Sequence, residues 1–157
     1  MRILGIDPGT GILGFGVIDC DKGKSKMVTA GVIRTPAHTP LDERLIEIFD
    51  GLNEIIAETS PTIMSIEKLF FARNVTTAMS VSHARGVAML VGKKAGLTIA
   101  EYTPLQIKKT LTGYGKAEKK QVQEMVRLTL NLKEIPKPDD AADALAAAIT
   151  HQMMTRF

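Results

Sequence analysis

Four carboxylates stand at positions where an acid needs a chemical reason. Asp7 ends the apolar run ILGID, and Glu67 ends the apolar run IMSIE. Asp140 and Asp143 lie three residues apart in DDAADAL, so both project from one face of a predicted helix. Converging carboxylates would repel one another without a cation. Because Mg²⁺ and Mn²⁺ take oxygen ligands, the residues predict a site for a hard cation.

Each of these acids also has a structural explanation when it is taken alone. Asp7 could bond the amides of the turn behind it, Glu67 could pair with a neighbouring base, and the last two could cap a helix. The joint reading depends on the strands that end at Asp7 and Glu67 being neighbours in one sheet. The two carboxylates would then emerge side by side, and the last helix would need only to cross that edge.

The glycines after Asp7 admit two rival interpretations. Residues 9–14, GTGILG, have the spacing of a dinucleotide-binding loop, but FGVID follows as an alternating strand and residues 27–33 contain no acid for a ribose. DPGTG is closer to the phosphate loop of the actin and sugar-kinase superfamily. That superfamily needs two duplicated domains, for which 157 residues leave no room. The aspartate is therefore the functional residue of this segment.

The elements that must position these acids follow an α/β pattern. The hydrophobic periodicity predicts the order β-β-β-α-β-α-β-α-α, with a meander joined to parallel crossover units. This order predicts a five-stranded mixed sheet with helices on both faces. The expected strands span residues 2–6, 13–20, 26–34, 62–67 and 97–102. The expected helices span residues 40–58, 74–94 and 138–154. A further helical segment begins at Thr103-Pro104 and resumes at 119–130 after a glycine-lysine loop.

Composition limits the class of protein. We expect one domain over residues 1–157, no membrane span and no secretory signal, and hence a cytoplasmic protein. A single cysteine excludes an intramolecular disulfide. Residues 68–133 carry twelve Lys or Arg against three acids, although the formal net charge is only +3. This basic block favours a polyanion such as nucleic acid, and a solvated lysine-rich surface is the alternative.

Four motifs resemble the successive motifs of the RuvC-type Holliday junction resolvases, bacterial members of the ribonuclease H-like superfamily. They are GIDPGTGILGFGVI, IEKLFFARN, YGKAEKKQVQ and DDAADALAAAITH, in the same order and spacing over nearly the whole chain. The resemblance implies a ribonuclease H-like fold and a homodimer that nicks two opposing strands of a four-way DNA junction. It also implies the branch-migration proteins RuvA and RuvB as partners.

The resemblance places the catalytic and metal-binding acids on Asp7, Glu67, Asp140 and Asp143. Two Mg²⁺ ions roughly 4 Å apart, with Mn²⁺ as a substitute, could activate water and neutralise the leaving oxygen. We expect Asp7 to bridge both ions and Glu67 and Asp143 to hold one each. Asp140, where some relatives have histidine, would complete the shell or orient the water. His151 lies two or three helical turns beyond this pair, which disfavours it as a ligand.

DNA contacts are expected from residues between the acids. By resemblance, Phe70 stacks on an opened base, an interaction that contributes about 1 to 3 kcal/mol, and Phe71 belongs to the core. Lys108 and Lys119 match the basic residues that face the scissile phosphate. Other candidates extend the phosphate track: Lys109, Lys116, Lys120, Arg73 and Asn74.

The helix over residues 74–94 has more apolar positions than one buried stripe requires. By resemblance it lies at the dimer interface, with Val81, Ala84 and Ala88 as candidate contacts. A buried core helix is the alternative. Two other functions stay open at this point: a scaffold that binds junctions without cutting them, and an ATP-hydrolysing domain.

Overall fold

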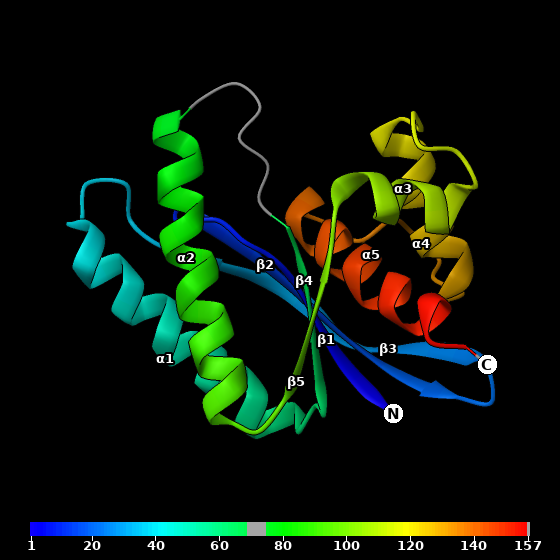
Figure 1. Ribbon diagram of the computed structural model, residues 1–157, viewed down its shortest axis with the longest axis horizontal. Helices are drawn as coiled ribbons and strands as arrows, with labels where there is room; N and C mark the ends of the chain where they lie inside the picture. Colours follow the sequence, from blue (N-terminus) through cyan, green and yellow to red (C-terminus); the bar gives the residue numbers. More distant parts are fainter. Residues whose placement is uncertain (69–74, 157) are drawn as a thin grey trace.

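The computed structural model describes residues 1–68 and 75–156, and these form one sheet between two helical layers (Figure 1). The strands are β1 (Arg2–Asp7), β2 (Ile12–Asp21), β3 (Lys24–Arg34), β4 (Ile63–Glu67) and β5 (Thr98–Tyr102). The helices are α1 (Leu41–Thr59), α2 (Val75–Lys94), α3 (Pro104–Thr112), α4 (Lys119–Thr129) and α5 (Asp139–Met154).

The sheet has the order β3-β2-β1-β4-β5. The meander β1-β2-β3 is antiparallel, and β4 and β5 add to it in parallel, so the predicted mixed sheet is confirmed. The strands β1 and β4 are neighbours, as the joint reading of the acids requires. In the part of the chain that the structure describes, no helix is both long and apolar enough to cross a bilayer.

One feature of the predicted order is wrong. Three helices follow β5 instead of two, because the segment after Thr103 divides at a turn. Gly113 has a φ of 77°, the left-handed conformation that ends many helices, and it closes α3. Glu118 and Gln121 then form a capping box that starts α4. The predicted start of α3 is confirmed, since Thr103 and Gln106 also form a capping box.

Each face of the sheet has its own apolar core. Leu4 and Ile6 of β1 pack with residues of α1 and α2, whereas Ile3 packs with residues of α3, α4 and α5. The alternation follows from the two-residue period of a strand. Figure 1 shows the two helical layers on opposite sides of the sheet. Asp7 has the same parity as Ile3, so it faces the layer that contains α5.

Candidate active site

Two of the predicted acids meet because of strand register. Ile6 of β1 pairs with Ile66 of β4 in a parallel ladder, so Asp7 and Glu67 end adjacent strands at the same edge. Since the paired isoleucines share one face of the sheet, the two carboxylates share the other. Asp7 and Glu67 are both largely buried, and each is partly accessible to solvent.

The other two acids reach this edge because α5 packs unusually close to the sheet. A Cβ on Gly14 would lie 2.0 Å from the carbonyl oxygen of Asp140, and a Cβ on Gly5 would lie 1.9 Å from that of Ala144. Gly14 is the cross-strand partner of Asp7. The glycines therefore let the start of α5 rest on the backbone beside Asp7. We call Asp7, Glu67, Asp140 and Asp143 the acid cluster.

A buried hydrogen bond ties α5 to the neighbouring strand. The Ser65 hydroxyl in β4 donates to the carbonyl oxygen of Ala147 at 2.7 Å, and Ser65 is fully buried. Nothing in the sequence pattern singled out this serine, because an isolated serine in an apolar strand has no distinctive signal. This hydrogen bond holds α5 against β4 at Ser65, two residues before Glu67.

Burial and mutual repulsion raise the pKa values within the acid cluster, and Lys108 and Lys119 oppose this only in part. Burial, together with the carboxylates of Asp143, Glu67 and Asp140, raises the pKa of Asp7 to about 8. Burial is also the main reason that the pKa values of Glu67 and Asp143 are raised. The carboxylate of Asp143 adds to the rise for Glu67, and those of Asp140 and Asp139 add to the rise for Asp143. Like charges in a poorly solvated site favour protonation or a bound cation.

Two predicted lysines line a cavity of about 270 Å³ beside the cluster. Lys108 of α3 and Lys119 of α4 face Glu67 and Asp143 across it, over an apolar floor. The floor is formed by Pro104, Ile107, Val122 and Ala146. Lys119 Nζ lies 3.5 Å from Asp143 Oδ2. Positive charge thus stands on the open side of the acids, where an anion would approach.

Lys119 has a second partner, Asp139, which was not among the predicted site residues. Its Nζ lies 3.3 Å from Asp139 Oδ2, and Asp139 Oδ1 also accepts a hydrogen bond from Gln123 Nε2 at 3.1 Å. Partial burial opposes the protonation of Lys119, but the carboxylates of Asp143 and Asp139 outweigh it and raise its pKa. Asp139 therefore holds Lys119 at the site. Three neighbouring aspartates gave no signal for which one would do this.

The donor set of the acid cluster fits a hard cation. It offers carboxylate oxygens without nitrogen or sulfur, and these are the ligands of Mg²⁺ and Mn²⁺. Within residues 1–68 and 75–156, no three acids, histidines or cysteines already stand at the spacing of metal ligands. Asp143 instead pairs with Lys119. Any bound ion would therefore require the carboxylates to turn toward it and Lys119 to release Asp143.

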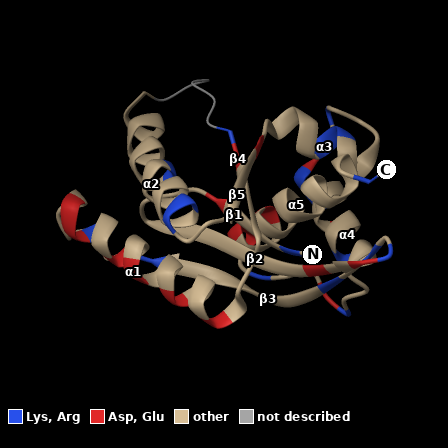
Figure 2. Cartoon of the chain, turned by 60° about the horizontal axis from the view of Figure 1, so that its bottom comes forward, with Lys and Arg blue, Asp and Glu red and all other residues tan. Residues whose placement is uncertain are grey.

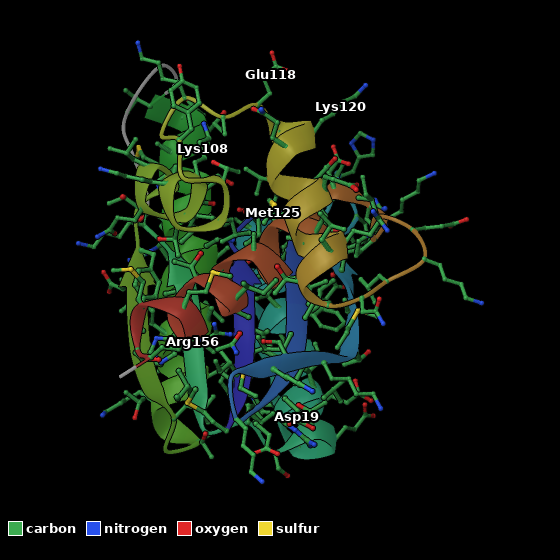
Figure 3. The ribbon with its side chains drawn as sticks, turned by 90° about the vertical axis from the view of Figure 1, so that its right-hand side faces the viewer. Asp19, Lys108, Glu118, Lys120, Met125 and Arg156 are labelled. Carbon is green, nitrogen blue, oxygen red and sulfur yellow. The ribbon has the colours of Figure 1, made fainter. Side chains whose placement is uncertain are left out.

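The remaining predicted residues lie at the periphery or outside the described chain. Lys109, Lys116 and Lys120 are exposed and do not line the cavity beside the acids. Figure 3 shows Lys108 and Lys120 at the same end of the molecule, on α3 and α4. Phe70, Phe71, Arg73 and Asn74 lie outside the described residues.

His151 has a partner away from the acid cluster. Its Nδ1 lies 2.8 Å from the hydroxyl oxygen of Tyr102, and burial lowers its pKa. This bond connects α5 to β5.

The helices α1 and α3 carry opposite charge. Figure 2 shows carboxylates spread along α1, on the opposite side of the sheet from α3, where lysines are prominent. The basic block predicted from residues 68–133 thus reaches the layer that carries the cavity. The lysines of α3 and α4 would attract a polyanion to that side.

Comparisons with known proteins agree with this geometry. The family described as "Crossover junction endodeoxyribonuclease RuvC" matches residues 3–151. The protein of that name from Brevibacillus brevis is 53% identical, over 100% of this chain and 95% of its own length. The one from Desulforamulus reducens is 54% identical, over 96% and 93%.

Solved structures give the same result. The structure titled "T. thermophilus RuvC in complex with Holliday junction substrate" has a TM-score of 0.94 and 36% identity, over 99% of this chain and 95% of that one. A yeast mitochondrial Holliday junction resolvase, 14% identical with a TM-score of 0.69, shares the fold. The five-stranded sheet and its two helical layers are thus a ribonuclease H-like fold.

Proposed function

Because the chain belongs to the RuvC family of crossover junction endodeoxyribonucleases, the Holliday junction resolvases, we propose that it cuts four-way DNA junctions with the acid cluster described above. The observation that carries this assignment is the meeting of four carboxylates from β1, β4 and α5 beside Lys108 and Lys119. Phosphodiester hydrolysis needs an activated water and charge neutralisation on both sides of phosphorus. The acids and the lysines supply complementary parts of that requirement.

Asp7 and Glu67 would hold divalent cations from the sheet edge, and Asp143 and Asp140 would hold them from α5. When bound, two Mg²⁺ ions supply an activated water and neutralise the leaving oxygen. Asp7, whose pKa is raised to about 8, would have to lose its proton to act as a ligand. Lys108 and Lys119 would attract and orient the phosphate beside the acid cluster. Mn²⁺, with similar preferences, would substitute.

Replacing either cavity lysine should slow cleavage, whereas replacing a nearby surface lysine should not. Lys108→Ala and Lys119→Ala should each reduce single-turnover cleavage about a hundred-fold, as expected for one group that stabilises transition-state charge. Each should make the salt dependence of junction binding shallower by about 0.9 in logarithmic slope, the value for one phosphate contact. Lys109→Ala is the matched control, because its side chain is exposed and outside the cavity. It should change the slope alone.

If Lys108→Ala leaves the salt dependence of junction binding unchanged, Lys108 does not contact a phosphate. Lys119→Ala needs a separate check by thermal unfolding, because it also removes the partner of Asp143 and Asp139.

The dimer is proposed to form through the exposed face of α2. Ala84 and Ala88, two of the candidate contacts in the sequence, are fully buried within the chain and belong to its core. Val75, Met79 and Leu90 are 68%, 56% and 54% exposed and share the opposite face of the helix. An exposed apolar stripe of this kind favours a protein partner. A two-fold dimer would present two equivalent active sites to paired scissile phosphates.

Cleavage of a labelled four-way junction tests the function and the dimer together. With Mg²⁺ the wild type should make two symmetric nicks, and without it the junction should be bound and left intact. Met79→Glu should sediment as a folded monomer, because a buried unpaired charge costs a few kcal/mol at an interface. Its nicks should lose their pairing. Ile46→Glu changes an equally exposed apolar residue, on α1, and should behave as wild type.

Metal-independent binding without any cleavage would instead identify a junction-binding scaffold. A wild type that sediments as a monomer on the junction would exclude the dimer. RuvA and RuvB as partners remain a prediction from the resemblance, and a cytoplasmic location remains a prediction from composition.

A further inference from the structure

A second cavity opens on the other face of the sheet, at the same end as the acid cluster. It has a volume of about 420 Å³ and lies between the β1–β2 connection, the first turns of α1 and the first turns of α2. Its lining is formed by Gly9, Thr10, Gly11, Arg44, Thr76, Thr77, Ser80 and Val81. Hydroxyl groups, one guanidinium and glycine backbone therefore surround it, and no carboxylate does.

Arg44 is the charged residue of this cavity, and its charge is unpaired within the described chain. Arg2, Arg85 and Arg127 each form an ion pair with a carboxylate. Arg44 is half-buried and uses only Nε, which donates to the Thr35 hydroxyl at 2.8 Å. Both Nη groups have no ion pair or hydrogen bond among residues 1–68 and 75–156. Its Nη groups can therefore donate charge-assisted hydrogen bonds to an anion in the cavity.

The guanidinium is held in place by a chain of hydroxyl groups. The Thr35 hydroxyl donates to the carbonyl oxygen of Thr10 at 2.5 Å, and the Thr10 hydroxyl lies 2.6 Å from the carbonyl oxygen of Ser80. Thr10 and Thr35 are 5% and 7% exposed. This chain links the β1–β2 connection to β3, α1 and α2. Arg44 is therefore oriented before any ligand arrives, which reduces the entropy lost on binding.

Glycine keeps the approach to Arg44 open. A Cβ on Gly11 would lie 3.1 Å from Arg44 Nη2, so the guanidinium lies directly over the glycine backbone. Gly9 and Gly11 follow Asp7 by two and four residues. The connection between β1 and β2 thus has the acid cluster on one side and the Arg44 cavity on the other. A DNA strand crossing this edge of the sheet would pass both.

We propose that Arg44 binds a backbone phosphate of the junction DNA in this cavity, on the opposite side of the β1–β2 connection from the scissile phosphate. Arg44 donates through both Nη groups, and the Thr76 and Ser80 hydroxyls complete the lining. The assignment rests on the proposed junction-cutting function and adds a contact outside the acid cluster and the cavity lysines. Its role is to position the strand, because a phosphate contact fixes register without reading sequence.

Thr76→Glu is the sharpest test, because it leaves the Arg44–Thr35 bond intact. Thr76 is exposed and lines the cavity, and an acid in the first turn of a helix does not oppose folding. The new carboxylate would neutralise Arg44 and repel phosphate. Junction affinity without divalent cation should fall about ten-fold near 0.1 M salt, the weight of one phosphate contact. Asn53→Glu adds the same charge at an exposed site of α1 outside the cavity and should bind as wild type.

Two substitutions of Arg44 itself complete the experiment. Arg44→Gln should make the logarithmic salt dependence shallower by about 0.9, whereas Arg44→Lys keeps the charge and should keep the slope. A folded Thr76→Glu protein with wild-type affinity would overturn the assignment even if Arg44→Gln fails to fold. If the wild type binds the junction and all variants match it, Arg44 alone is misassigned. A wild type that binds no junction would overturn this proposal and the proposed function together.

Discussion

Asp7→Asn is expected to abolish junction cleavage while the protein folds and binds the junction at least as tightly as wild type. The carboxylates of Asp143, Glu67 and Asp140 all raise the pKa of Asp7. Removing its charge weakens cation binding, and loss of several kcal/mol of metal-derived stabilisation corresponds to about a thousand-fold in rate. Single-turnover cleavage and binding on the same junction give both quantities. Near-normal nicking would remove Asp7 from the site.

The same substitution should stabilise the metal-free protein, and more so at high pH. The folded state keeps the Asp7 proton up to a pKa of about 8, whereas the unfolded chain loses it near 4. The folded state therefore binds more protons between these values, and the free energy of unfolding falls as pH rises, by up to about 1.4 kcal/mol per pH unit for one such group. Thermal unfolding of wild type in chelator should become easier from pH 5 to pH 8, and Asp7→Asn should flatten this dependence. Mg²⁺ should restore wild-type stability at pH 8.

Gly14→Ala is expected to abolish most of the cleavage activity although it replaces none of the four acids. Its new Cβ would lie 2.0 Å from the carbonyl oxygen of Asp140, so α5 must move away from the sheet. Overpacking of this kind costs about 1 to 3 kcal/mol of folding free energy. A displacement of about 1 Å at reacting groups costs about a hundred-fold in rate. Cleavage should thus fall about a hundred-fold while thermal unfolding still shows a cooperative, folded protein.

Gly31→Ala is the matched control for that prediction. Its Cβ would approach only the tip of the Phe15 ring at 2.9 Å, on the other face of the sheet, and a ring can shift where a helix backbone cannot. Cleavage by Gly31→Ala should stay within a few-fold of wild type. Equal losses in the two variants would show that general strain in the sheet, rather than the position of α5, causes the defect.

Local pattern predicted most of the fold. Strand and helix bounds fall within two residues of the observed ones wherever the chain is described, because alternation and helical periodicity are strong in segments such as residues 62–67 and 138–154. The predicted order counted the segment after Thr103 as one helix interrupted by a loop, whereas the structure divides it into α3 and α4. That division depends on the left-handed Gly113, whose conformation the glycine-lysine loop does not specify.

The site was predictable in its acids and less so in its supports. Asp7 and Glu67 are recognisable because each ends an apolar strand, and pairing of β1 with β4 then brings them together. Ser65 bonds a backbone carbonyl of α5, and Asp139 pairs with the amine of Lys119 on α4. Single contacts of this kind between distant segments produce no pattern in the sequence. Arg44 gave no signal for the same reason, since its partner Thr35 lies outside its own helix.

The close approach of α5 to the sheet also sets an order of events during protein synthesis. A ribosome polymerises the chain from its N-terminus, so all five strands are made before Asp140 and Asp143 are added. A nascent chain that stops short of α5 has only Asp7 and Glu67 of the acid cluster, and the sheet face that α5 covers is bare. We therefore expect a chain that stops short of α5 to lack nuclease activity, because half of the acid cluster is missing.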